Sequence, residues 1–144
     1  MRNEVFSMKI MAIDYGDAHT GIAISDRTLT LTGCSTVITA YRPDIVIAEV
    51  QKLIAEHGVT ELVLGHPLNM DGTRGPRAEK AEGFAEMLRS ATSLPVTLWD
   101  ERRTTVEAHN ILSECNYHGK KRKNTVDAVA ASLILEGYLS FLSR

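Results

Sequence analysis

The stretch Met8–Ser25, MKIMAIDYGDAHTGIAIS, decides the fold of this 144-residue chain. Apolar residues run almost without interruption from Met8 to Ile13, which is typical of a strand buried on both faces. His19–Ser25 is a second strand candidate, and the short turn at Gly16 favours antiparallel pairing of the two. The stretch therefore predicts a hairpin whose first strand is central to a sheet and leads directly into Asp14.

The remainder of the chain alternates between strands and helices. Pro43 opens a helix that Gly58 closes. The other predicted elements are strands at Gly33–Ala40, Glu61–Gly65 and Pro95–Trp99, helices at Pro76–Arg89, Thr105–Glu114 and Thr125–Leu142, and a polar, basic linker at Asn116–Asn124. The order β-β-β-α-β-α-β-α-α predicts an α/β fold of three layers, in which a mixed five-stranded sheet carries helices on both faces. We expect one domain over residues 1–144, with residues 1–7 as a ragged extension or Met8 as the true start.

Composition limits the classes of protein that need considering. Sixteen Lys and Arg residues against eighteen Asp and Glu give a net charge of -2, so any nucleic-acid surface must be local. The two cysteines, Cys34 and Cys115, belong to no metal-binding or disulfide pattern. No apolar run is long enough to span a bilayer, and the first residues lack the apolar segment of a signal peptide. We therefore expect a cytoplasmic protein that is not inserted in a membrane.

Acidic residues follow the carboxyl ends of three predicted strands. Asp14 follows the first strand, Asp100 and Glu101 follow the fifth, and Asp71 lies in the loop after the fourth. An isolated aspartate before a glycine is most simply explained as a cap for turn amides. Because sites in open α/β sheets form at the carboxyl ends of the strands, acids at three such ends favour a functional site.

A further acid, Asp127, lies on the last predicted helix. It shares helical spacing with Ala131, Ile134 and Tyr138, so its carboxylate is expected to face the sheet. A first-turn acid that favours the helix dipole, with Asn124 as the cap, is an equal alternative. A buried carboxylate needs a cation or several donors to keep its charge, so the inward position predicts a positive partner.

Convergence of Asp14, Asp127, and Asp100 or Glu101 would place three carboxylates at one end of the sheet. Their mutual repulsion requires a divalent cation, and hard oxygen ligands select Mg²⁺ or Mn²⁺. Two such ions roughly 3.5–4 Å apart activate a water and stabilise the leaving oxygen in phosphodiester hydrolysis. The acids therefore predict a two-metal hydrolase acting on ester bonds, that is, a nuclease.

Basic residues flank the predicted acids on both sides, and a polyanionic substrate would explain their placement. A short basic run is usually a solvated loop, but one next to an acidic site favours phosphate contacts. The residues concerned are Arg102 and Arg103 after Glu101, and the run Lys120, Lys121, Arg122 and Lys123 before Asp127. Arg102 and this run are the expected nucleic-acid-binding residues.

Five short motifs resemble those of one known family. They are Ile13–Gly16, Gly21–Asp26, Gly65–Thr73, Asp100–Thr105 and Asp127–Ala131. Together they resemble the YqgF/RuvX family of RNase H-like proteins, and the likeness extends from Met8 to the end of the chain. The strings PLNMDGT and DERRTT are specific to that likeness, whereas an aspartate two residues before a glycine, as at Asp14 and Gly16, is weak evidence.

The resemblance implies a nuclease that processes the 5′ end of pre-16S rRNA in ribosome biogenesis. The alternative that it implies is a Holliday junction resolvase acting on four-way DNA. The family's catalytic, metal-binding acids would be Asp14, Glu101 and Asp127, with Asp14 bridging two metal ions and the other two binding one each. Asp100 would be a further ligand or an orienting group.

Asn69 and Asp71, in the specific PLNMDGT string, are expected to position the substrate. The sequence departs from the family at His19, where arginine is usual, so a fixed positive charge near the site is replaced by a side chain that can be neutral at pH 7. The partner is nucleic acid, either pre-rRNA or branched DNA. A monomer and a homodimer both remain open, although junction cleavage would need two sites.

Two other readings compete with a nuclease. An aspartate before a glycine also opens the two-lobed sugar kinases and actin-like ATPases, but 144 residues provide one lobe and the chain has no P-loop. The second reading is a non-catalytic module that binds structured RNA through backbone and shape. Few aromatic residues are present for base stacking, at 6% of the chain. Loss of Asp14 would leave binding by such a module intact.

Overall fold

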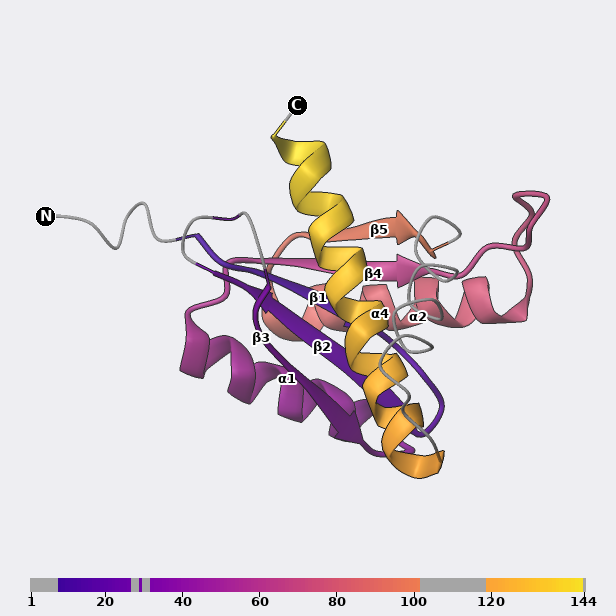
Figure 1. Cartoon of the computed structure of the whole chain (residues 1–144), viewed down its shortest axis with the longest axis horizontal. Coiled ribbons are helices and arrows are strands. Elements are labelled where there is room, and N and C mark those ends of the chain that lie inside the picture. The colour runs from indigo at the N-terminus through magenta and orange to yellow at the C-terminus, as the bar shows by residue number, and fades with distance from the viewer. Residues whose placement is uncertain (1–7, 27–28, 30–31, 102–118, 144) are drawn as a thin grey trace, which may run out of the picture.

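One mixed five-stranded sheet, in the order β3-β2-β1-β4-β5, forms the middle of the molecule (Figure 1). The computed structural model describes residues 8–26, 29, 32–101 and 119–143, with the backbone alone at 119–127. The strands are β1 (Ile10–Asp14), β2 (His19–Ser25), β3 (Thr32–Thr39), β4 (Glu61–His66) and β5 (Val96–Asp100). The helices of this described part are α1 (Pro43–His57), α2 (Pro76–Thr92) and α4 (Gly119–Leu142). The strand β1 is central, as the sequence predicts.

Strand pairing aligns the carboxyl ends of three strands. The strands β1 and β4 pair in parallel with Ile13 opposite Leu64, and β4 and β5 pair in parallel with His66 opposite Asp100. The hairpin of β1 and β2 is antiparallel, as predicted, and places Asp14 opposite Gly21. The ends of β1, β4 and β5 therefore lie side by side at one edge of the sheet, which is the expected location of the site.

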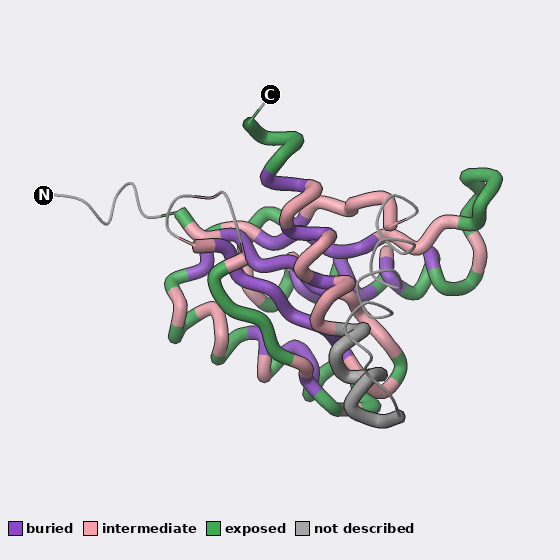
Figure 2. The backbone as a smooth tube through the Cα atoms, in the orientation of Figure 1, coloured by how far each residue is buried: buried purple, intermediate pink, exposed green. Residues whose placement is uncertain are grey.

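Helices cover both faces of the sheet, which confirms the three-layer architecture. Figure 1 shows α1 and α2 on one face and α4 crossing the other. Alternate residues of β1 supply the two apolar layers: Met11 and Ile13 pack toward α1 and α2, and Ile10 and Ala12 pack toward α4. Figure 2 shows the central strands buried and the edge strand β3 exposed.

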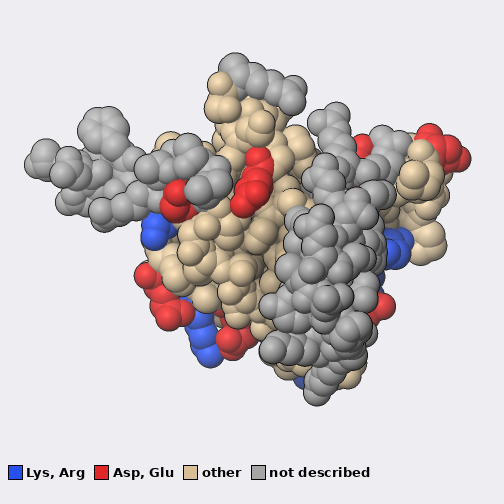
Figure 3. Space-filling view, viewed as in Figure 1, with Lys and Arg blue, Asp and Glu red and all other residues tan. Residues whose placement is uncertain are grey.

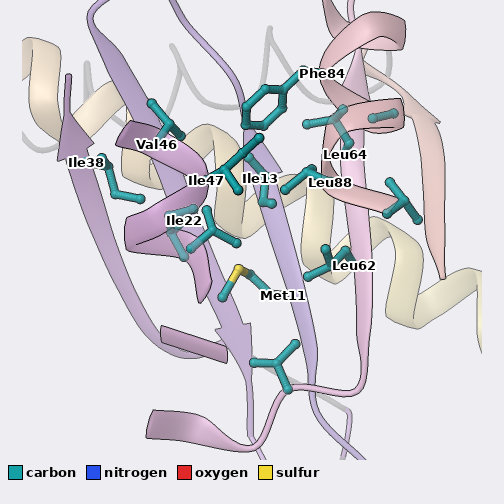
Figure 4. Packing of buried hydrophobic residues seen from close by; sticks show 14 of the residues in the cluster. Met11, Ile13, Ile22, Ile38, Val46, Ile47, Leu62, Leu64, Phe84 and Leu88 are labelled. Atoms are coloured by element: carbon teal, nitrogen blue, oxygen red, sulfur yellow. The ribbon is translucent and has the colours of Figure 1, made fainter. Parts of the chain in front are cut away.

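The larger apolar layer is continuous from the sheet to α1 and α2 (Figure 4). Phe84 and Leu88 of α2 are buried against Ile13 and Leu64, and Val46 of α1 is buried on the same side. Full burial of such a side chain contributes roughly 1.5–3 kcal/mol. This layer fixes α2 beside the ends of β1 and β4.

The helix ends follow the local chemistry of the chain. Pro43 and Pro76 stand in the first turns of α1 and α2, where a missing N–H costs little. Gly58 ends α1 in the left-handed region at φ 69° and ψ 40°, as predicted. Ser93 ends α2 at φ 58°, so this helix continues past the predicted end at Arg89.

Two predicted boundaries were wrong. The strand β1 includes Asp14, which we had placed just after the strand. The last helix begins at Gly119 and not at Thr125, so most of the predicted linker Asn116–Asn124 is helical. Lysine and arginine are good helix formers and no proline interrupts this run, so the helix continues through it. The predicted helix Thr105–Glu114 lies outside the described residues.

None of the helices in the described part of the chain is long and apolar enough to cross a membrane.

Replacing Thr20 by valine should stabilise the fold. Thr20 of β2 is fully buried, and its Oγ1 has no hydrogen-bond partner among the described residues. Burying an unsatisfied hydroxyl is unfavourable, so the nearly isosteric Thr20→Val should raise the free energy of unfolding by about 1 kcal/mol. Urea denaturation measures this change. Thr36→Val, on the exposed strand β3, is the control and should have little effect; a destabilised Thr20→Val protein would contradict the expectation.

Candidate active site

Asp14, Asp100 and Glu101 lie at the aligned carboxyl ends of β1 and β5, on either side of the end of β4. Asp14 is the last residue of β1, Asp100 is the last of β5, and Glu101 follows directly. Side chains alternate along a strand, so Asp14 shares the α4 face with Ala12, and Glu101 shares it with Trp99. Asp14 and Glu101 therefore share one face of the sheet, and Asp100, one residue before Glu101, lies on the other.

Gly65 at the end of β4 provides the space that Glu101 occupies. A Cβ atom on Gly65 would lie 2.6 Å from Oε2, 2.7 Å from Cδ and 2.8 Å from Cγ of Glu101. Each of these distances is shorter than a normal van der Waals contact. The Glu101 carboxyl group thus lies directly over the β4 backbone, between the ends of β1 and β5, because residue 65 has no side chain.

The Glu101 carboxyl group lies in a buried and electrostatically mixed environment. Burial raises its pKa above the ordinary value of 4.5. A side-chain hydrogen bond with Asp14 acts in the opposite direction, as do the charges of Arg77 and His66, whereas Asp100 adds to the increase. Two hydrogen-bonded carboxyl groups in one desolvated place require either a shared proton or a cation.

The third predicted acid, Asp127, stands on α4, and the structure describes only its backbone. One turn further along the helix, Ala131 is fully buried against the sheet, and Ile134 and Tyr138 continue this buried stripe. Among the side chains that the structure describes, no group of three or more His, Cys, Asp or Glu could hold a metal ion. The side chains of Lys120, Lys121, Arg122 and Lys123, and the whole of Arg102, lie outside the described residues.

Asn69 and Asp71 lie in the loop between β4 and α2, and their side chains bond within it. Asp71 Oδ1 accepts hydrogen bonds from the backbone N–H and the hydroxyl of Thr73 at 3.0 and 2.6 Å. Asn69 Nδ2 donates to Thr73 Oγ1 at 2.9 Å. The loop projects from the end of the molecule that carries the acids (Figure 1), with Met70 exposed at its tip. These bonds fix the shape of the projecting loop.

An ion-pair network ties this loop to the sheet edge and to α2. Arg74 donates to both carboxylate oxygens of Glu82 over 2.5–3.1 Å, and His66 Nε2 lies 2.7 Å from Glu82 Oε2. The hydrogen bonds from Arg74 and His66 lower the pKa of Glu82 from 4.5 to about 2. Glu82 thus connects the end of β4 to the base of the loop.

Glu82→Gln should flatten the acid dependence of stability. Because the pKa of Glu82 is lower in the folded state, its contribution is fully present above pH 4.5 and is lost as the pH falls toward about 2. The urea midpoint of the parent should therefore fall more steeply than that of the variant across this window. Glu86→Gln, on the same helix and paired with Arg89 in solvent, is the control. Equal slopes for parent and Glu82→Gln would refute this contribution.

His19, the predicted departure from the family, begins β2 close to the site. Its Nδ1 lies 3.3 Å from Thr39 Oγ1 on β3, and its backbone carbonyl oxygen would be 2.4 Å from a Cβ on Gly16. The turn between Asp14 and His19 can therefore close only over a glycine. This close approach sets how the chain leaves Asp14.

A central β1 ending in an acid, with a second acid after the parallel strand β5, defines an RNase H-like domain. T. thermophilus RuvC in complex with a Holliday junction has a similar fold, with a TM-score of 0.58 at 14% identity over 93% of this chain and 96% of that one. Residues 8–141 match the family model described as "RuvX: Holliday junction resolvase". The chain belongs to this RuvX family, which the sequence motifs predicted.

Two relatives extend this comparison to nearly the full length of the chain. A "Putative pre-16S rRNA nuclease" of Halothermothrix orenii is 43% identical over 137 residues, covering 95% of this chain and 98% of the relative. A protein of the same name from Carboxydothermus hydrogenoformans is 42% identical over 139 residues, covering 95% and 99%. The likeness to RuvC, by contrast, shows the fold alone.

Sequence reasoning missed two features of this edge. The sequence marked Gly65 as the end of a strand and the start of a family motif, but did not predict that its missing side chain makes room for Glu101. Glu82 was not singled out, although its bonds to Arg74 and His66 join the loop to the sheet. A glycine at a strand end beside predicted acids was the available signal for the first. The network had no such signal because its members are distant in sequence.

Proposed function

We propose that this chain is a metal-dependent nuclease that hydrolyses phosphodiester bonds at the 5′ end of pre-16S rRNA. The observation that carries this proposal is the hydrogen-bonded pair of Asp14 and Glu101 at the carboxyl edge of an RNase H-like sheet. Membership in the RuvX family, and the name that its close relatives carry, support nucleic acid as the substrate and pre-16S rRNA as the polymer.

The donor set at this edge fits a divalent cation with hard oxygen ligands. Asp14 and Glu101 offer carboxylate oxygens in direct contact, and burial makes their combined negative charge unfavourable without a positive partner. Mg²⁺ or Mn²⁺ suits such a site, because both ions prefer hard oxygen ligands.

We assign each residue a role from its position at the carboxyl end of the sheet. Asp14, on the central strand, would bridge two ions, and Glu101 and Asp127 would each hold one of them. When bound, the ions would supply an activated water and charge stabilisation for the leaving oxygen. Asp100 lies on the opposite face of β5 from Glu101, so we assign it an orienting role through its effect on the charge of Glu101.

Arg102 and the run Lys120–Lys123 would contact phosphates, and Asn69 and Asp71 would hold the loop that borders the substrate path.

A four-way DNA junction is the second candidate substrate. The family model is described as a Holliday junction resolvase, and the RuvC fold is the structural parallel. Cutting a junction symmetrically would need two active sites in one dimer.

Cleavage assays on both polymers test the proposal. A labelled pre-16S 5′-leader RNA and a labelled four-way DNA junction are each incubated with the protein and Mn²⁺ or Mg²⁺. We expect site-specific, metal-dependent cleavage of the RNA. Cleavage of the junction alone would move the assignment to resolvase. Binding of RNA without cleavage under any metal condition would replace the enzyme with an RNA-binding module.

A further inference from the structure

A hollow lies on the α2 side of the sheet, beside the residue that follows Asp14. Its volume is about 330 Å³. It lies between the β1–β2 turn, the residue after β4, and the first turns of α2, and is lined by Tyr15, Gly16, Asp17, Pro67, Pro76, Arg77 and Lys80. Tyr15 directly follows Asp14, and its ring stacks on Phe84 with centroids 3.9 Å apart, which fixes the wall of the hollow.

The charged side chains of the hollow leave it net positive. Lys80 forms an ion pair with Asp17, and this hydrogen bond raises the pKa of Lys80 and lowers that of Asp17. Arg77 is exposed and makes no ion pair or side-chain hydrogen bond with the described residues, whereas Arg42, Arg74 and Arg89 are each paired. One carboxylate therefore faces two cations, and the charge of Arg77 is left available for a ligand.

Arg77 is electrostatically coupled to the active-site edge. Arg77 lines the hollow, and its charge acts on Glu101 as well as on Asp17, so the guanidinium is within electrostatic range of the Glu101 carboxyl group. Basic side chains lie beneath the projecting loop at the right of Figure 3, beside acidic ones. A polyanion that crosses the carboxyl edge of the sheet would thus meet a cation just beyond the acids.

We propose that this hollow holds a backbone phosphate of the substrate that flanks the cleaved one, and that Arg77 is the residue that positions it. The inference rests on the proposed nuclease function and adds a second point of contact to it. A guanidinium carries several N–H donors in one plane and can bind a phosphate through two parallel hydrogen bonds. The apolar walls formed by Tyr15, Pro67 and Pro76 partly exclude water and strengthen such a contact.

Binding of the leader RNA under varied salt tests the contact apart from catalysis. The variant is Arg77→Gln, and Lys9→Gln is the control, because Lys9 also lacks an ion pair with the described residues but stands before β1 at the other end of the sheet. Arg77→Gln should weaken binding about tenfold and reduce the slope of log Kd against log salt by about 0.7–1. Lys9→Gln should change neither. Equal effects of both variants would overturn the inference.

A substrate scan then locates the phosphate. Leader RNAs that carry one neutral methylphosphonate at successive positions are bound to the parent and to Arg77→Gln. The parent should lose affinity at one position flanking the cleavage site, and Arg77→Gln should not lose further affinity there. Additive losses at every position would overturn the contact.

Cleavage rates of the parent and of Arg77→Gln on the leader RNA test the phosphate contact and the nuclease function separately. Arg77→Gln should keep the parent's melting temperature and lose kcat/KM about tenfold on the leader RNA. Cleavage by the parent with an unchanged Arg77→Gln would refute the phosphate contact alone. Absence of cleavage by the parent would refute the nuclease, while the salt slopes would still decide the contact.

Discussion

Asp14→Asn should reduce metal-dependent cleavage of the leader RNA by more than about 100-fold while leaving the melting temperature unchanged or raised. Groups that only support a metal ligand are worth about 10- to 100-fold, so loss of a ligand that bridges two ions should exceed this. Asparagine has nearly the same shape as aspartate, and it can still bond to Glu101. Removing one of two adjacent, partly buried carboxylates also relieves their repulsion, so the fold should not suffer.

Asp44→Asn is the matched control for this substitution. The same aspartate-to-asparagine change is made on α1, where the exposed carboxylate of Asp44 pairs with Arg42. Its replacement should alter cleavage less than twofold, since exposed ion pairs contribute little and the residue is remote from the sheet edge. Rates for Asp14→Asn that match those of the parent would remove Asp14 from the chemistry. A large drop in its melting temperature would instead make Asp14 a structural residue.

Gly65→Ala should reduce cleavage about 10- to 100-fold with little loss of stability. The new methyl group would need the space of the Glu101 carboxyl group, at 2.6–2.8 Å, so that the carboxyl group must move away. The clash is with the end of a flexible side chain, which can rotate at small cost to folding. Displacement of a reacting group by about 1 Å can cost 10²-fold in rate.

Gly83→Ala shows what the same substitution does away from the site. Gly83 is exposed on α2, and nothing lies within 4 Å of the added Cβ. Alanine is a better helix former than glycine, so this variant should be more stable by roughly 0.5–1 kcal/mol and should cleave like the parent. If Gly65→Ala cleaved as fast as Gly83→Ala, the position of the Glu101 carboxyl group would not matter for the reaction.

The sheet edge was predictable because local patterns determine it. The apolar run before Asp14, the short turn at Gly16 and the parallel pairing implied by intervening helices together place the carboxyl ends of β1, β4 and β5 in one row, with β4 between the two strands that carry the acids. In the structure Asp14 forms a side-chain hydrogen bond with Glu101, whereas the strand-end argument left Asp100 and Glu101 as alternatives. Strand order therefore carried most of the information about where the acids meet.

Features that depend on distant contacts were not predictable in the same way. The basic run from Lys120 resembles a loop by charge but is helical, because helix propensity and the packing of the following residues outweigh the unfavourable charge near the helix start. The network of Glu82 with Arg74 and His66, and the hollow beside Arg77, exist only once α2 is packed on the sheet. Periodicity in the sequence says which face of α2 is buried, but not which polar groups meet at its rim.

Metal dependence of leader-RNA cleavage is the most direct test of the central claim that the carboxylates of this edge work through a divalent cation. The parent is stripped with EDTA, assayed, and then titrated with Mn²⁺ and separately with Mg²⁺. The account predicts no cleavage in EDTA and a rate that rises to saturation as either ion is restored. Cleavage that continues undiminished in EDTA would contradict it.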